Sequence, residues 1–164
     1  MPARQCLGFV FHWRVCSDTL PADKQSCPCA LIMNTDVASQ QGSHWVCLYI
    51  DKNGHGDYFD SYGREPMQEE MIKFLNLNCI EWKSNKKRLQ GYMSTVCGQN
   101  CVYFHLKRCR NMLLTSIVAI FSNKNYDLND YTVSRYVKLR FKIEPVNQSE
   151  YVLQQICRAL DIIQ

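Results

Sequence analysis

The chain has 164 residues, of which 46% are hydrophobic and 21% charged, and its net charge is +4 at pH 7. These values are ordinary for a globular protein and predict one domain, residues 1–164, with a sizeable core. No apolar run approaches the roughly 18 residues needed to cross a bilayer, and the N-terminus does not resemble a signal peptide. An intracellular protein that is neither secreted nor membrane-bound is therefore expected. The positive charge permits contact with nucleic acid or an acidic partner without requiring it.

Ten cysteines are a high count for this length. A secreted disulfide scaffold would predict a shorter chain with a signal peptide. A structural zinc site would predict paired C-x2-C spacings, but the nearest here are Cys27 with Cys29 and Cys97 with Cys101. The count favours a reduced protein that has buried thiols, one or two of them chemically special, and no metal.

The first half of the chain predicts strands. Residues 1 to about 26 give no clear pattern, and residues 7–13 fit either a short strand or a helix. Apolar runs at residues 29–33 and 45–50 predict strands, and the second of these is followed by Asn53-Gly54, a strong hairpin signal. His44 enters this hairpin, while Asp60 leaves its second strand. Both side chains should therefore lie near the same end of the hairpin.

The second half predicts helices. The expected elements are a helix at residues 67–77, a short strand at 79–82, and helices from Cys97 to about 108–110, at 113–121, at 128–141 and at 150–163. This order predicts an α+β class with a mixed central β-sheet packed between helices. The core should span about residues 20–142, followed by a C-terminal helical extension at 145–164.

Cys97 is expected in the first turn of a helix that Ser94 or Thr95 caps. The unpaired N–H groups and the dipole at that end favour negative charge, and the thiolate is the nucleophilic form of cysteine. The alternative is an ordinary core cysteine. Two further side chains favour the nucleophile: His44 could accept the proton of the thiol and Asp60 could orient the imidazole. Gln90 could supply an oxyanion donor.

These residues resemble the adenovirus protease (adenain) family. The resemblance rests on Ser43-His44-Trp45, on Tyr58-Phe59-Asp60-Ser61-Tyr62-Gly63, and on Gln90 seven residues before Cys97-Gly98. The nearest relatives are the adenain-like proteases of Polinton-type transposons and related DNA viruses, and SUMO-specific proteases share the same core. Where typical mammalian adenovirus enzymes carry Glu, this chain has Asp60, as do the SUMO proteases and the transposon relatives.

The resemblance implies a cysteine endopeptidase. Cys97 would be the nucleophile, His44 the general base and acid, Asp60 its orienting carboxylate and Gln90 an oxyanion donor. Trp45 would flank the substrate groove, although it also fits a core strand position. No cofactor is required for this chemistry. The implied substrates are capsid or core precursor proteins cut at glycine-containing sites during virion maturation.

Two alternatives remain open at this stage. One is a protease that removes a ubiquitin-like modifier with a Gly-Gly tail, and the other is a catalytically idle DNA- or capsid-binding protein on the same fold. The resemblance further implies location in the virion and host nucleus, and a monomer is expected.

The family also uses activating partners. A short capsid-derived peptide is tethered through a disulfide, and Cys79-Ile80 has the sequence context of the tethering cysteine. A plain strand cysteine is the other interpretation of Cys79. Non-specific DNA is the second implied partner. The basic residues that could contact DNA are Lys86, Lys87, Arg88, Lys107, Arg108, Arg110, Arg135, Lys138, Arg140 and Lys142.

Overall fold

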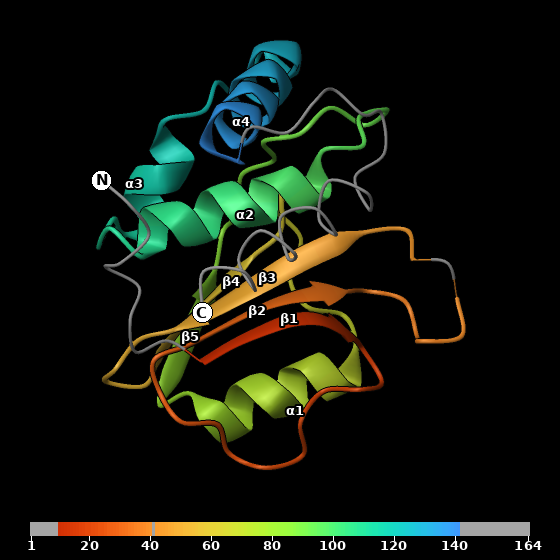
Figure 1. Ribbon diagram of the computed structural model, residues 1–164, viewed down its shortest axis with the longest axis vertical. Coiled ribbons are helices and arrows are strands. Elements are labelled where there is room, and N and C mark those ends of the chain that lie inside the picture. Colours follow the sequence, from red (N-terminus) through yellow and green to blue (C-terminus); the bar gives the residue numbers. More distant parts are fainter. Residues whose placement is uncertain (1–9, 41, 142–164) are drawn as a thin grey trace.

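The computed structural model describes residues 10–40 and 42–141, which form one sheet with helices on both faces (Figure 1). In chain order the elements are β1 (Val10–Cys16), β2 (Cys29–Asn34), β3 (Trp45–Ile50), β4 (His55–Phe59), α1 (Glu69–Asn78), β5 (Glu81–Ser84), α2 (Cys97–Arg108), α3 (Leu114–Ala119) and α4 (Tyr126–Phe141). The five strands run in the order β1-β2-β3-β4-β5. The three central strands are antiparallel, and β1 and β5 each join an edge in parallel. The predicted class, a mixed sheet packed between helices, is confirmed.

The sheet is buried on both faces, and this explains the long apolar runs in β2 and β3. Helices α2, α3 and α4 cover one face and α1 covers the other (Figure 1). Side chains alternate along a strand, so each strand contributes to two cores. The core under α2 contains Ala30, Ile32, Trp45, Cys47 and Tyr49. The core over α1 contains Cys29, Leu31, Met33, Val46, Leu48 and Ile50.

Several elements differ at their boundaries from the sequence expectation. The strand predicted at 79–82 lies at Glu81–Ser84, because α1 continues to Asn78 and the Cys79 N–H donates to the Leu75 carbonyl at 2.8 Å. Residues 7–13, which were open between strand and helix, overlap β1. Helix α4 begins at Tyr126, earlier than expected. The helix and extension predicted beyond residue 145 lie outside the described residues.

The expected cap of α2 is wrong. Val96 occupies the N-cap and no side-chain hydrogen bond caps the helix. The Ser94 carbonyl instead accepts a hydrogen bond from the Gln90 side chain at 2.8 Å. The segment before α2 is therefore shaped by contacts to Gln90 rather than by a capping hydroxyl. No helix among the described residues is long and apolar enough to cross a membrane.

The turn after β4 requires glycine at position 63. Gly63 has a φ of +71°, and its N–H donates to the Asp60 carbonyl at 2.8 Å. A Cβ at this position would lie 2.7 Å from the backbone carbon of Lys87, so the turn packs against the following loop at a distance that only glycine allows. The position of Asp60 depends on this close approach.

Substitution of Gly63 by alanine should destabilise the fold by about 1–3 kcal/mol, since it adds both a backbone clash and a left-handed conformation that alanine disfavours. Urea denaturation of the variant measures this loss. Glu70→Ala, at an exposed position of α1, is the matched control and should unfold near the wild-type midpoint. Equal midpoints for both variants would contradict the assigned turn.

Candidate active site

The β3–β4 hairpin brings His44 and Asp60 together. His44 Nε2 lies 2.8 Å from Asp60 Oδ1, and the two side chains are 14% and 3% exposed. On the other side of His44, its carbonyl accepts a hydrogen bond from the Thr35 N–H at 2.9 Å, which continues the pairing of β2 with β3. The histidine is thus fixed by two neighbouring strands, and the expectation that it meets Asp60 at one end of the hairpin is confirmed.

Asp60 is held by its own turn and by the loop after β5. Its backbone N–H donates to Asn85 Oδ1 at 2.9 Å, and its carbonyl accepts from Asn85 Nδ2 at 2.7 Å. Its Oδ1 also accepts the Tyr62 N–H at 2.7 Å. This oxygen is the one that faces His44. The carboxylate therefore has a fixed direction before any substrate binds.

Cys97 is the first residue of α2 and is only 6% exposed. The first hydrogen bond of the helix runs from the Asn100 N–H to the Val96 carbonyl at 2.9 Å. The N–H groups of Cys97 and Gly98 therefore have no helix carbonyl one turn earlier that could accept a hydrogen bond from them. These N–H groups and the positive end of the helix favour negative charge on the thiol. The sequence prediction that Cys97 starts a helix is confirmed.

His44 links the carboxylate to the thiol. Burial alone would lower the pKa of His44, but hydrogen bonds to Asp60 and Cys97, together with their negative charges, raise this pKa from 6.5 to about 9. Since Nε2 faces Asp60, Nδ1 is the ring nitrogen available to the thiol. With this raised pKa, the His44 imidazole can be positively charged at neutral pH.

Gln90 is fully buried, and its side-chain amide is oriented by two groups. Its Oε1 accepts a hydrogen bond from Ser61 Oγ at 2.7 Å, and its Nε2 donates to the Ser94 carbonyl at 2.8 Å. The other nearby group is the Tyr62 hydroxyl, at 3.5 Å from Nε2. One N–H of the amide is thus engaged, while the second has only a long contact. An amide held in this way is rigid, and its long contact with Tyr62 is the weaker of its two donor contacts.

Helix α4 holds the loop that carries Gln90. Asn129 Nδ2 donates to the Leu89 carbonyl at 2.9 Å, and the Gly91 N–H donates to Asp130 Oδ2 at 3.2 Å. Asp130 is half-buried, and burial raises its pKa. The residues on both sides of Gln90 are therefore fixed to the same helix.

Sequence reasoning missed two residues of this site, Tyr62 and Asn85. The Tyr62 ring lies 4.9 Å from the His44 ring, centroid to centroid, in addition to its contacts with Asp60 and Gln90. The hairpin signal could have indicated this position, because extending the pairing of Cys47 with Phe59 places Tyr62 opposite His44. No local pattern marks Asn85, since its contact with Asp60 joins distant parts of the chain.

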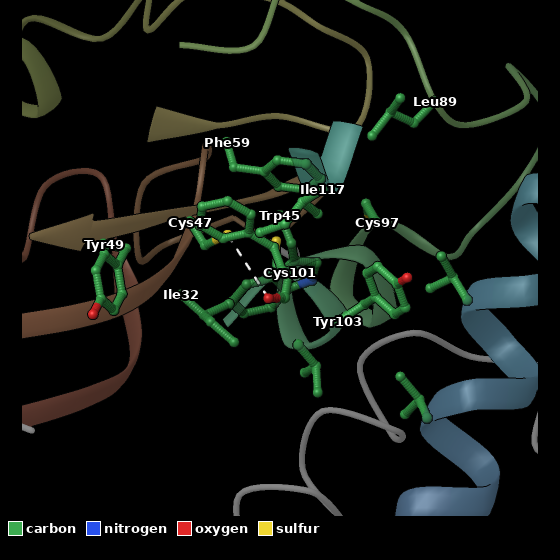
Figure 2. Close-up of a cluster of buried hydrophobic side chains, with 14 of the residues drawn as sticks. Ile32, Trp45, Cys47, Tyr49, Phe59, Leu89, Cys97, Cys101, Tyr103 and Ile117 are labelled. Carbon is green, nitrogen blue, oxygen red and sulfur yellow. Dashed lines mark hydrogen bonds between the residues drawn. The ribbon is translucent and has the colours of Figure 1, made fainter. Parts of the chain in front are cut away.

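Two other predicted residues lie outside this arrangement. Trp45 is 6% exposed and belongs to the core under α2, where Figure 2 shows it among Phe59, Cys47 and Cys101. Its role beside a substrate groove stays a prediction. Cys79 is half-buried at the end of α1 rather than on a strand. Burial and the nearby Cys27 thiol raise the pKa of Cys79 to about 11, which disfavours the thiolate needed for disulfide exchange.

Several of the basic residues predicted to contact DNA have partners within the protein. Arg108 is 8% exposed and pairs with Asp57 at 2.9 Å. Lys87 donates to the Val118 carbonyl, and Lys107 stacks on Tyr103 at 5.0 Å. DNA binding stays a prediction for the remainder. Within the described part of the chain, no group of three or more His, Cys, Asp or Glu side chains is placed to hold a metal ion.

Comparison with known sequences gives one partial match. No model of a protein family matches the chain. A stretch of 71 residues is 38% identical to a candidate thiol protease of Acanthamoeba polyphaga mimivirus. The match covers 37% of this chain and 24% of that relative, so the chain spans about a quarter of the relative's length.

Comparison with solved structures shows the fold. ChlaDub1 of Chlamydia trachomatis has a TM-score of 0.52 and 16% identity, covering 82% of this chain and 68% of that protein. A protease of African swine fever virus (ASFV) has a TM-score of 0.49 and 22% identity, covering 63% of this chain and 41% of that protein. The likeness to ChlaDub1 places the chain in the mixed α/β fold of SUMO-protease-like cysteine proteases.

The pKa of His44 can be measured directly. Its imidazole should titrate near pH 9 in NMR spectra, and below that pH both ring nitrogens should be protonated, so that the ring is positively charged. Asp60→Asn removes the negative charge beside the ring and should lower this pKa, since a neutral amide stabilises the imidazolium less. The His44→Gln variant identifies the signal among the four histidines. A His44 titration that is unchanged in Asp60→Asn would contradict the pairing.

Proposed function

We propose that this protein is a cysteine endopeptidase with Cys97 as nucleophile and His44 as general base and acid. The observation that carries the proposal is the position of His44, whose Nε2 lies 2.8 Å from Asp60 Oδ1 and whose pKa is raised by Asp60 and by Cys97, the first residue of α2. The partial identity to a thiol protease supports the same reaction. Kinship with adenain-like proteases is part of this proposal.

The first half of the reaction would form an acyl-enzyme. The Cys97 thiolate attacks the scissile carbonyl carbon, so that a C–S bond forms and the carbonyl oxygen takes the negative charge. The Cys97 N–H and the second N–H of Gln90 Nε2 donate to this oxygen. When the C–N bond breaks, the proton on His44 passes to the leaving amine.

The second half would release the acid. Neutral His44 takes a proton from water, and the resulting hydroxide oxygen attacks the thioester carbon. The C–S bond then breaks, the carboxylic acid product leaves, and the thiolate is restored beside the imidazolium. Asp60 keeps Nε2 protonated throughout, so that Nδ1 carries the transferred proton.

The proposed substrates are capsid or core precursor proteins of a virus or mobile element, cut at glycine-containing sites in the virion or host nucleus. The resemblance to adenain-like enzymes and the mimivirus relative support this choice. The alternative is removal of a ubiquitin-like modifier, and the fold shared with ChlaDub1 over 82% of the chain keeps it in consideration. An activating peptide at Cys79 and non-specific DNA remain proposed partners.

The catalytic roles predict different kinetic losses. Cys97→Ala should abolish peptide cleavage, because no other group supplies the nucleophile. Gln90→Ala should lower kcat by about 10²–10³-fold with a small change in KM, as expected for the loss of an oxyanion donor. Steady-state kinetics measures both, and circular dichroism controls for folding. Wild-type kcat in Gln90→Ala would remove Gln90 from the mechanism.

Covalent probes separate the candidate functions. A short Gly-Gly peptide vinyl sulfone should label Cys97 of the wild-type protein, whereas the same warhead on a ubiquitin-like protein should react no faster. Intact mass and peptide mapping identify the labelled cysteine, and Cys97→Ala is the control. Faster labelling by the ubiquitin-like probe would favour the deconjugating function. Labelling by neither probe would favour a catalytically idle protein.

A further inference from the structure

We infer that an aromatic and arginine surface beside His44 selects substrates with an acidic side chain near the scissile bond. This surface, the arginine platform, consists of Tyr62, Arg64, Arg88, Tyr92 and Tyr126. The inference rests on the proposed function and names the class of substrate that its active site would take.

The platform begins at the active site and continues outward as a series of stacked groups. Tyr62 lies 4.9 Å from the His44 ring and 6.3 Å from the Tyr92 ring. The Arg88 guanidinium lies 3.7 Å from the Tyr92 ring centre and 3.9 Å from that of Tyr126. Arg64 stacks on Tyr62 at 5.1 Å. Two positive charges are therefore held on rings that lead away from His44.

The loop between Gln90 and Cys97 exposes part of the platform to solvent. Tyr92 is 72% exposed, and the next residue, Met93, is 96% exposed. A polypeptide that reaches the Cys97 thiol must pass close to this loop. An exposed aromatic residue and an exposed methionine next to a candidate active site are typical of a surface that binds another chain.

Among the described residues, Arg64 and Arg88 differ from Lys86 and Lys73 in having no carboxylate partner. Lys86 pairs with Glu65, and Lys73 pairs with Glu69 at 2.8 Å. Among the described residues no ion pair joins Arg64 or Arg88 to an acidic side chain, and both instead stack on tyrosine rings. Their positive charges are thus not neutralised within the part of the chain that the structure describes.

Stacking prepares a guanidinium to bind a carboxylate. Its flat faces lie against the rings, and the N–H donors at the edge of a guanidinium can bind two carboxylate oxygens. Arg88 Nη1 is buried and has no hydrogen-bond partner among the described residues, so it is one donor that a ligand oxygen could satisfy. The Arg88 guanidinium lies between the rings of Tyr92 and Tyr126, and this limits its motion. Since less side-chain entropy is lost when a ligand binds, an arginine held in this way binds an acid better than a mobile lysine would.

The distances limit where the acidic residue lies in the substrate. An extended chain advances about 3.3–3.6 Å per residue. The ring-to-ring steps of 4.9 and 6.3 Å each correspond to one or two such residues. The selected acid should therefore lie within about four residues of the scissile bond.

A peptide series tests this selection. Fluorogenic Gly-Gly peptides would carry Glu, Gln or Lys at each of four positions on either side of the cleavage site. At one or two positions, Glu should raise kcat/KM about threefold to tenfold over Gln, and Lys should lower it. The preference should shrink as salt rises, because exposed charges are screened. Equal kcat/KM for Glu and Gln at every position would overturn the inference.

Variants assign the preference to the platform. The double variant Arg64→Gln and Arg88→Gln should bring the Glu-to-Gln ratio close to one, whereas Lys73→Gln, on α1, should keep the wild-type ratio. Arg88→Glu should invert the preference toward Lys. A ratio that persists in the double variant overturns the inference. Loss of DNA affinity in the double variant, with the ratio intact, would assign the platform to nucleic acid instead.

Binding separates this inference from the proposed function. Fluorescence anisotropy of the same peptides with Cys97→Ala protein needs no cleavage, so it tests the platform even if the wild type cuts nothing. Tighter binding of the Glu peptide, lost in the double variant, supports the platform whatever the enzyme does. Equal affinities for Glu and Gln peptides overturn it.

Discussion

The hydrogen bond between His44 and Asp60 is the constraint on which the rest of the candidate site depends. It forms because the hairpin places both residues at one end and because Asn85 fixes the backbone of Asp60 from two sides. The raised pKa of His44 follows from this contact and from Cys97, which together outweigh the effect of burial. The charge on His44 at neutral pH therefore depends on the register of the sheet as well as on the cysteine.

The site also joins the two halves of the fold. The sheet supplies His44 and Asp60, while the helical half supplies Cys97 from α2 and the contacts from α4 that hold the Gln90 loop. The two halves meet in the core under α2, which Figure 2 shows around Trp45 and Cys101. Because Cys97 belongs to this same core, packing under α2 sets the distance between thiol and imidazole. A core substitution there would change reactivity together with stability.

The features that could be predicted from the sequence are those that short, local patterns of residues determine. The strand at residues 45–50 was placed correctly because a sheet buried on both faces gives an unbroken apolar run, and the start of α2 at Cys97 followed from the change in polarity. The short strand was misplaced because nothing in the sequence marks where α1 ends and β5 begins. Asn85 was missed because its contact with Asp60 joins residues that are distant in the sequence. The cap predicted for α2 was wrong because Ser94 contacts Gln90 instead of capping the helix. The roles of His44, Asp60, Gln90 and Cys97 were assigned from residue chemistry and from resemblance. The hairpin predicted that His44 meets Asp60, whereas the approach of Cys97 to His44 is a finding of the structure.

The contacts of α4 with the Gln90 loop have a consequence for synthesis of the chain. A polypeptide leaves the ribosome from its N-terminus onward, and a domain folds as a unit. His44, Asp60 and Cys97 all emerge before Asn129 and Asp130, which hold the loop on both sides of Gln90. A nascent chain that ends before α4 thus lacks the residues that hold the Gln90 loop. Under the proposed function, the order of residues along the chain would therefore delay the complete active site until α4 has been made.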